Sequence, residues 1–153
     1  MAVEKRVLLA RPHAFIVNQM RPFLLEAGYT PVGAQSVEHL AQELRGTFHG
    51  AIISTAVSST VDADAATVFR LVREKLPRLP IVFAGMADAA TMKLSAERAV
   101  KALVSTPTIT SPQDLRISTA ADRSATFLVL RKEDLMPGES QEAAMRALRT
   151  LFG

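Results

Sequence analysis

The sequence lacks cysteine altogether. A chain without cysteine has no disulfide framework, no thiolate metal site and no cysteine nucleophile. It also lacks any apolar run that approaches the length of a membrane span, which is about 20 residues. The first residues, Met1-Ala2-Val3-Glu4-Lys5-Arg6, lead directly into a short apolar segment and do not have the pattern of a secretory signal peptide. We therefore expect a cytoplasmic location and no contact with a membrane.

Long blocks of charge of one sign are absent as well. The formal net charge is +3 and the pI is about 9.7. Acids and bases are interleaved, as in Arg73-Glu74-Lys75 and Arg131-Lys132-Glu133-Asp134. A nucleic-acid-binding surface would need a basic stripe. We therefore expect a mixed, solvated surface and no nucleic-acid partner.

The length and the composition fit one globular domain. A chain of 153 residues lies in the usual range for a single domain and can bury a substantial core. Hydrophobic residues make up 48 %, which is typical of globular proteins and too high for a disordered chain. Short apolar runs alternate with segments of helical periodicity, and this alternation indicates strand–helix–strand units around a parallel sheet.

The expected strands are short apolar runs bounded by turn residues. A continuous run such as Val7–Ala10 is typical of a strand that is buried on both faces. The strands predicted in this way are 7–10, 30–34, 50–54, 79–84 and 102–104. The helices predicted from apolar spacing and caps are 12–27, 37–44, 65–76, 89–100 and 139–152.

Several segments together resemble bacterial response-regulator receiver domains. The segments are Val7–His13, Glu26-Ala27-Gly28-Tyr29, Ala51–Thr55, Pro80–Met86 and Lys101–Pro107. Their order and separation also match. The resemblance implies an α/β fold, a doubly wound parallel sheet of the receiver or flavodoxin-like three-layer type with strand order 2-1-3-4-5. It further implies one domain over residues 1–153, with a receiver-like core at 5–116 and a C-terminal extension at 117–153.

The chain beyond Pro107 admits two interpretations. In the first, Ala102–Val104 is the fifth strand, and Phe127–Leu130 and the last helix add an extra strand and helix to the sheet. In the second, residues 108–124 are an inserted loop and Phe127–Leu130 is itself the fifth strand. We prefer the first because Lys101–Pro107 lies at the expected separation from the fourth strand.

The chain departs from the receiver pattern at the strand ends, where that family carries its phosphorylation site. Ala10 and Arg11 stand in place of an acidic pair, and Thr55 stands at the position equivalent to the phosphoacceptor aspartate. Gly85 replaces a hydroxyl residue, and Thr106 replaces a lysine. These residues form a degenerate pocket.

The substituted residues cannot perform the family's chemistry. Phosphoryl transfer to a carboxylate needs a divalent cation that is held by acidic oxygens. Alanine offers no ligand, a guanidinium repels the cation, and a threonine cannot form an acyl phosphate. We therefore expect no metal site, no catalytic residue and no switching by aspartyl phosphate.

Arg11 would lie where receivers hold their magnesium ion. Three roles for its side chain are open at this point. It could hold the pocket in one fixed state, it could bind a small anion, or it could point into solvent beside the first loop.

A second class of function uses the same pocket. His13 lies just after the first strand and could act as a base for Ser54 or Thr55 in a small-ligand-binding or enzymatic flavodoxin-like domain. The sequence has no Gly-x-Ser-x-Gly, Gly-x-Gly-x-x-Gly or P-loop pattern. The Asp-x-His-x-x-Gly loop of cobalamin-binding domains is also absent, because Arg11 and Ile16 stand at its Asp and Gly positions. We expect no cofactor, and we expect His39 and His49 to be solvated.

The preferred interpretation is a phosphorylation-independent, receiver-like signalling module rather than an enzyme. Its partner would be a protein in a bacterial signalling pathway. By resemblance, Met92–Thr110 is the segment expected to form a homodimer interface. The apolar face of the C-terminal helix is the alternative, since it must be buried somewhere.

Overall fold

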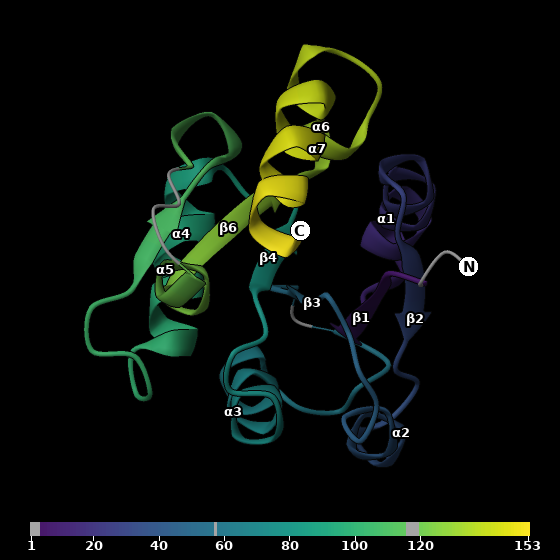
Figure 1. The fold of residues 1–153 in the computed structure, drawn as a ribbon, viewed down its shortest axis with the longest axis vertical. Helices are drawn as coiled ribbons and strands as arrows, with labels where there is room; N and C mark the ends of the chain where they lie inside the picture. Colours follow the sequence, from purple (N-terminus) through teal and green to yellow (C-terminus); the bar gives the residue numbers. More distant parts are fainter. Residues whose placement is uncertain (1–3, 57, 116–119) are drawn as a thin grey trace.

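The fold is built around one six-stranded sheet, shown in Figure 1. The computed structural model describes residues 4–56, 58–115 and 120–153. The strand order is β2-β1-β3-β4-β6-β5, and every strand pair is parallel. The strands are β1 (Arg6–Arg11), β2 (Thr30–Gly33), β3 (Gly50–Ser54), β4 (Ile81–Gly85), β5 (Thr108–Thr110) and β6 (Thr126–Arg131). The doubly wound α/β sheet of receiver type that the sequence predicts is confirmed.

Helices cover both faces of the sheet. They are α1 (Ala14–Ala27), α2 (Val37–Glu43), α3 (Ala65–Lys75), α4 (Ala89–Val100), α5 (Ala120–Ala125), α6 (Lys132–Leu135) and α7 (Glu139–Phe152), with a 3₁₀ turn η1 (Pro112–Asp114). One core layer joins α1 and α7 to the sheet, and the other joins α2, α3 and α4. Figure 1 shows α1 and α7 above the sheet and α2 and α3 below it.

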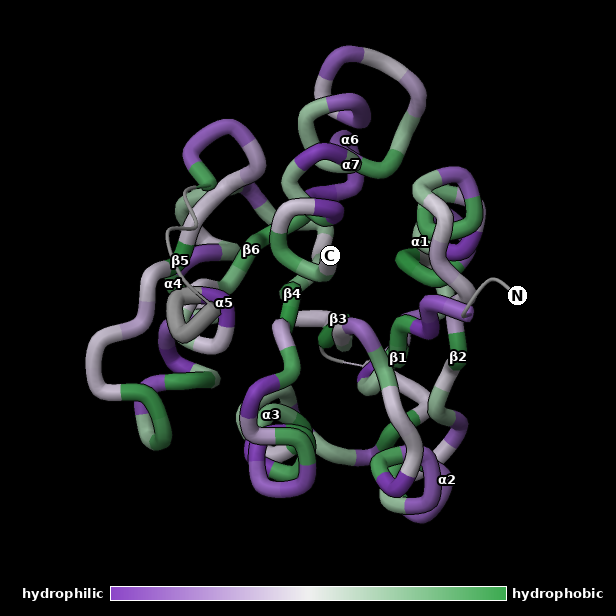
Figure 2. Tube along the Cα trace, viewed as in Figure 1, coloured by the Kyte–Doolittle hydropathy of each residue, from purple (hydrophilic) through white to green (hydrophobic). Residues whose placement is uncertain are grey.

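The central strands consist largely of apolar residues, which the hydropathy colouring of Figure 2 draws in green. All residues of β3 and β4 are buried. This pattern is expected of a parallel sheet covered by helices on both sides, because alternate side chains enter different core layers. Ile53 and Phe83 enter the layer under α3 and α4, whereas Ile52 and Val82 enter the layer under α1 and α7.

The strand beside β4 is β6, and this corrects the preferred prediction for the fifth strand. Ala102 and Leu103 form a turn after α4, and Val104 does not belong to a strand. β6 contains Phe127–Leu130 and pairs with β4, whereas the short strand β5 lies outside it at the sheet edge. The alternative interpretation had therefore identified the correct segment. Residues 126–152 are integral to the sheet and its cover, not an extension added to a finished core.

The last helix is buried within its own chain. Ala144, Leu148 and Leu151 of α7 have no exposed surface, and they pack in the same core layer as Met20 and Leu24 of α1. The apolar face of α7 is therefore covered inside the molecule. The prediction that the apolar face of the C-terminal helix forms a homodimer interface is therefore wrong.

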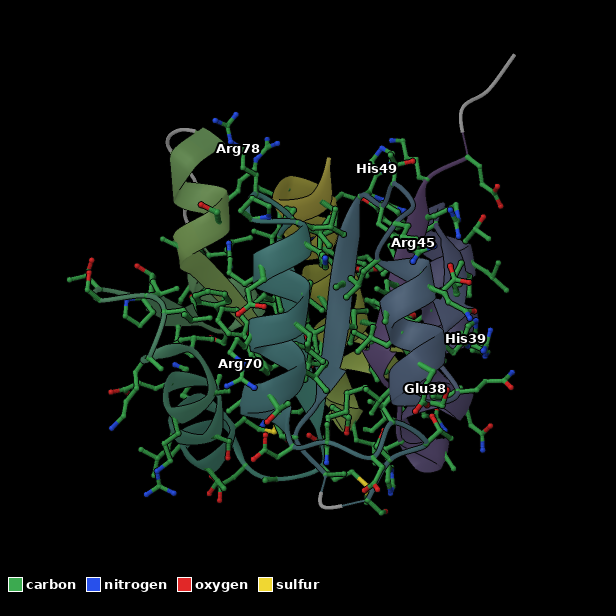
Figure 3. All side chains as sticks on the ribbon, turned by 90° about the horizontal axis from the view of Figure 1, so that it is seen from below. Glu38, His39, Arg45, His49, Arg70 and Arg78 are labelled. Carbon is green, nitrogen blue, oxygen red and sulfur yellow. The ribbon has the colours of Figure 1, made fainter. Side chains whose placement is uncertain are left out.

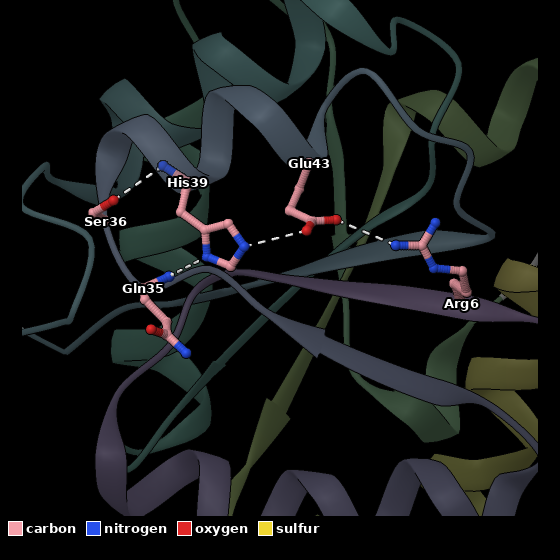
Figure 4. A network of polar contacts seen from close by, with 5 residues as sticks. All are labelled: Arg6, Gln35, Ser36, His39 and Glu43. Carbon is pink, nitrogen blue, oxygen red and sulfur yellow. Dashed lines mark hydrogen bonds and ion pairs between the residues drawn. The ribbon is translucent and has the colours of Figure 1, made fainter.

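A polar network fastens α2 to the sheet (Figure 4). The Ser36 hydroxyl caps the helix by accepting the His39 N–H at 3.0 Å. His39 Nε2 lies 3.2 Å from Glu43, and Glu43 accepts a hydrogen bond of 3.2 Å from Arg6 on β1. The Arg6 guanidinium also stacks 4.5 Å from the centre of the Phe48 ring. His39 thus makes these contacts while 32 % of its side chain stays exposed to solvent.

Charged side chains surround the two core layers. Figure 3 shows Arg70 on α3 and Glu38 on α2, with Arg45 and Arg78 in the segments that follow these two helices. Over the described part of the chain, no helix is both long and apolar enough to cross a membrane.

Candidate functional site

Thr55 and Gly85 lie side by side at the carboxyl edge of the sheet. The Thr55 N–H donates to the Ala84 carbonyl at 2.9 Å, so it continues the pairing of β3 with β4. A Cβ atom added to Gly85 would fall closer than 3.0 Å to Thr55 Oγ1. The sequence expectation that these two positions share a pocket therefore agrees with the geometry.

The space where receivers place a hydroxyl at position 85 is filled in this protein. The Thr55 hydroxyl lies 3.4 Å from Met92 Sδ, and the same sulfur would lie 2.7 Å from a Cβ on Gly85. Met92 belongs to the first turn of α4 and is fully buried. A serine or threonine at position 85 would have to displace both side chains, so this part of the pocket has no room for a second hydroxyl group.

Arg11 is buried and bonded to the loop that follows β3. Only 4 % of the residue is exposed. Its Nε donates to the Ala63 carbonyl at 2.7 Å, and Nη1 donates to the carbonyls of Ser54 at 2.7 Å and Ala56 at 2.5 Å. The side chain does not point into open solvent. It closes the β3–α3 loop over the end of β1, in the region where receivers gather carboxylates.

The guanidinium stays charged in this setting. Burial lowers the pKa of Arg11, and the carboxylate of Asp64 partly offsets that effect. The pKa of Asp64 is itself lowered, first by the hydrogen bonds from Thr67 at the start of α3 and to a smaller extent by Arg11. An arginine remains protonated under such conditions. An anion would need the Nε and Nη1 donors, but both of these atoms bond to protein carbonyls. Anion binding at Arg11 stays a prediction.

Hydroxyl groups hold the same loop from its other side. The Ser59 hydroxyl donates to the Pro12 carbonyl at 2.5 Å, and the Thr60 hydroxyl donates to the Ala34 carbonyl at 2.9 Å. These contacts connect the loop to the segments that follow β1 and β2. The sequence marked this stretch only as polar, because nothing in the local pattern shows which distant carbonyls its hydroxyls reach.

Thr106 lies away from the pocket, which corrects another site prediction. It precedes β5, and β5 runs parallel to β6, so Thr106 lies toward the amino-terminal edge of the sheet. The residue that ends the strand beside β4 is Arg131, which is in register with Gly85. The sequence contains a pattern that indicates Arg131 as the end of this strand, because the apolar run at 127–130 is followed directly by Arg131 and Lys132.

His13 makes no hydrogen bond to Ser54 or Thr55 among the described contacts. Its Nδ1 atom is buried without a partner, and the Ser54 hydroxyl accepts the Ala56 N–H at 3.1 Å. A base must lie within hydrogen-bond reach of the hydroxyl that it activates. The geometry therefore gives no support to a nucleophile–base pair at this edge.

The residues at the carboxyl edge do not fit a magnesium ion. Ala10 is fully buried and has no ligand atom, and the neighbouring position holds the bonded cation of Arg11. Magnesium is bound through carboxylates, and a guanidinium repels it. Within residues 4–56, 58–115 and 120–153, no three acidic, histidine or cysteine side chains come together as a metal site.

Comparisons with known proteins identify the architecture. No known protein-family profile matches the sequence, and no curated protein matches it. Several solved structures do match. A response regulator receiver protein from Sinorhizobium medicae is 17 % identical with a TM-score of 0.57, over 97 % of this chain and 94 % of that one. The receiver domain of NtrX from Brucella abortus is 13 % identical with a TM-score of 0.58, over 97 % of this chain and 98 % of that domain.

A third similar structure provides a contrast at the site. The receiver domain of a sensor histidine kinase from Pseudomonas aeruginosa PAO1 is 13 % identical with a TM-score of 0.57, over 99 % of this chain and 100 % of that domain. That structure holds a magnesium ion coordinated in its active-site cleft. The matches extend over almost the whole of each single domain. The chain therefore has the fold of bacterial response-regulator receiver domains.

Proposed function

We propose that this protein is a receiver-like signalling module that works without phosphorylation, through contacts with other protein molecules. The observation that carries the proposal is the environment of Arg11. A buried guanidinium bonded to the carbonyls of Ser54, Ala56 and Ala63 takes the place of a metal with its carboxylates. The loop that follows the acceptor position is thereby fixed by the protein's own side chain.

The neighbouring positions support the same proposal. Thr55 has no carboxylate, and its hydroxyl contacts Met92 Sδ. The position in register with the end of β6 is Gly85, which has no room for a hydroxyl side chain. Phosphoryl transfer depends on positioning and on neutralisation of charge by a metal. These side chains provide neither the positioning nor the metal, so we propose no reaction in the pocket.

Incubation with acetyl phosphate and Mg²⁺ tests the absence of phosphorylation. We expect the intact mass of the protein to stay unchanged, and we expect the Thr55→Asp variant also to stay unmodified, because Ala10 and Arg11 supply no metal ligand. An intact receiver domain treated in parallel is the positive control. A stable gain of one phosphate by the wild-type protein, lost on mild alkaline treatment, would overturn the proposal.

The surface proposed for protein contact is the segment Met92–Thr110. It contains two large apolar side chains that are about half exposed, Leu94 at 48 % and Leu103 at 47 %. It ends in β5, a three-residue strand that pairs with β6, and no other strand of the described residues pairs with its outer edge. An unpaired strand edge can pair with another chain, and exposed apolar patches mark contact surfaces. We propose that two copies of the chain associate here.

The variant Leu94→Glu/Leu103→Glu tests this surface. We expect sedimentation equilibrium to show self-association of the wild-type protein and at least a roughly tenfold higher dissociation constant for the variant, since each glutamate would bury a charge. Leu25→Glu is the matched control, because Leu25 is 62 % exposed but lies on α1. A wild-type protein that stays monomeric, or a variant that associates equally well, would contradict the dimer.

A further inference from the structure

A groove lies at the amino-terminal edge of the sheet, opposite to the edge that carries the degenerate pocket. Its two walls are the segments 44–49, between α2 and β3, and 76–80, between α3 and β4. The two segments are neighbours because β3 and β4 pair in parallel, and the Ala51 N–H donates to the Pro80 carbonyl at 3.0 Å. The groove has a volume of about 390 Å³, and its lining includes Phe48, Lys75, Leu76, Pro77, Arg78 and Pro80.

The floor of the groove is apolar. It is formed by Phe48, Leu76, Pro77 and Pro80, of which Pro77 is exposed and the other three are half-buried. Apolar surface that stays in contact with water gains stability when a partner covers it. The groove is open to solvent, whereas a small-molecule site normally buries about 70–90 % of its ligand. An open groove of this kind suits a segment of polypeptide that lies across it.

The walls of the groove are held by contacts within the protein. Arg73 Nη1 donates to the Pro77 carbonyl at 2.7 Å on one wall. On the other wall, the Arg6 guanidinium lies 4.5 Å from the centre of the Phe48 ring. Proline also fixes the backbone φ angle at its own position. A surface that is formed in advance loses little conformational entropy when a partner binds.

The charges beside this floor are positive. Lys75 and Arg78 line the groove and are exposed, and neither makes an ion pair within the part of the chain that the structure describes. The two wall segments contain no acidic residue, and Arg45 adds another exposed cation to one of them. Figure 3 shows Arg45 and Arg78 beyond the ends of α2 and α3. Glu74 precedes Lys75 on α3 but lies outside the lining. The groove therefore presents uncompensated positive charge next to apolar surface, which attracts an acidic partner.

We propose that this groove binds an acidic segment of a partner protein. An apolar side chain of that segment covers the floor, and flanking carboxylates bind Lys75 and Arg78. An arginine can hold a carboxylate through two parallel hydrogen bonds. A nucleic acid would need a longer basic stripe and has no apolar side chain for the floor. None of the lining residues belongs to Met92–Thr110, so this partner is additional to the self-association proposed there.

Titration of the full ¹⁵N-labelled chain with a synthetic peptide tests the proposal. The probe is acetyl-Glu-Asp-Glu-Leu-Phe-Asp-Glu-Asp-amide, and we expect saturable shifts of the Thr47, Phe48 and Leu79 backbone signals. One control peptide has Ser-Ser in place of Leu-Phe, and the other has lysine in place of every acid. We expect neither control to saturate the groove. Equal binding of the Ser-Ser peptide would reveal charge attraction without a groove contact and would overturn the proposal.

Two double variants locate the binding site. Lys75→Glu/Arg78→Glu is expected to weaken binding of the acidic peptide by at least about tenfold, because it reverses both charges that face the carboxylates. Arg21→Glu/Arg146→Glu is the matched control, since it makes the same change in net charge at exposed positions of α1 and α7 and should leave binding unchanged. Arg78→Glu alone suffices if the first double variant does not fold.

Three results would overturn the proposal. The first is an absence of saturable shifts with the acidic peptide, and the second is equal binding by the two double variants. The third is saturation by hexanoate or by oligothymidylate without saturation by the peptide, which would identify a small apolar carboxylate or a nucleic acid as the occupant.

Discussion

Replacement of Arg11 by alanine is expected to lower the free energy of unfolding by about 3–5 kcal/mol. The substitution removes hydrogen bonds from a charged donor to three carbonyl oxygens, those of Ser54, Ala56 and Ala63. Each bond to a charged group contributes about 1.5–3 kcal/mol, and a carbonyl left unpaired and buried adds a cost of its own. The cost of burying the guanidinium itself keeps the net effect below the simple sum of these values. Urea denaturation followed by circular dichroism measures the change.

The loop, rather than the sheet, is expected to respond first in the Arg11 variants. Backbone amides of residues 58–63 should exchange with solvent faster in Arg11→Ala, because the bond to Ala63 that closes this loop is lost. Arg11→Lys should have an intermediate stability, because one ammonium cannot reproduce the fork of donors. Arg98→Ala is the control, since Arg98 is exposed on α4 and should change stability by less than about 0.5 kcal/mol. Equal stability of Arg11→Ala and Arg98→Ala would show that the guanidinium does not hold the loop.

The position of Arg11 could be predicted from the sequence, but its partners could not. The run that precedes it places it at the end of a buried strand, and the parallel sheet brings that end next to Thr55. The carbonyls that it bonds belong to the end of β3 and to the loop after it, 43 to 52 residues away. Backbone carbonyls are present at every residue and leave no mark in the sequence. The sequence alone therefore could not show whether the Arg11 side chain points into solvent, binds an anion or bonds to the loop.

The fifth position of the sheet shows a different limit of sequence reasoning. Ala102-Leu103-Val104 is apolar and stands before Ser-Thr-Pro, so it imitates a strand end with its turn. Phe127–Leu130 is a stronger strand candidate, because aromatic and β-branched residues favour strands. No local pattern indicated the short strand Thr108–Thr110. This strand occupies the edge of the sheet, so β6 lies between it and β4. The error also displaced one site residue, because Thr106 was assigned the place that belongs to Arg131.

We expect that only glycine fits at position 50, because the ring of Phe152 lies directly against it. A Cβ added to Gly50 would lie 2.5 Å from both Cδ1 and Cζ of that ring, and closer still to Cε1. Gly50 opens the buried strand β3, and Phe152 is 5 % exposed at the end of α7, with its ring 5.8 Å from the ring of Tyr29. Neither the strand nor the ring can yield easily. We expect Gly50→Ala to lower the free energy of unfolding by about 2–3 kcal/mol, the usual cost of an overpacked core.

Truncation of the ring should cost more, and the two changes should compensate each other. Phe152→Ala is expected to lower stability by about 3–5 kcal/mol, because it empties the space between α7 and β3. In the double variant the new methyl group no longer meets a ring, so the total loss should be smaller than the sum by about 2 kcal/mol. Urea denaturation of the wild type, both single variants and the double variant measures this coupling. Strictly additive losses would mean that Gly50 is required for a reason other than contact with Phe152. A coupling of the expected size would show that Phe152 of the C-terminal helix packs against Gly50 of the third strand.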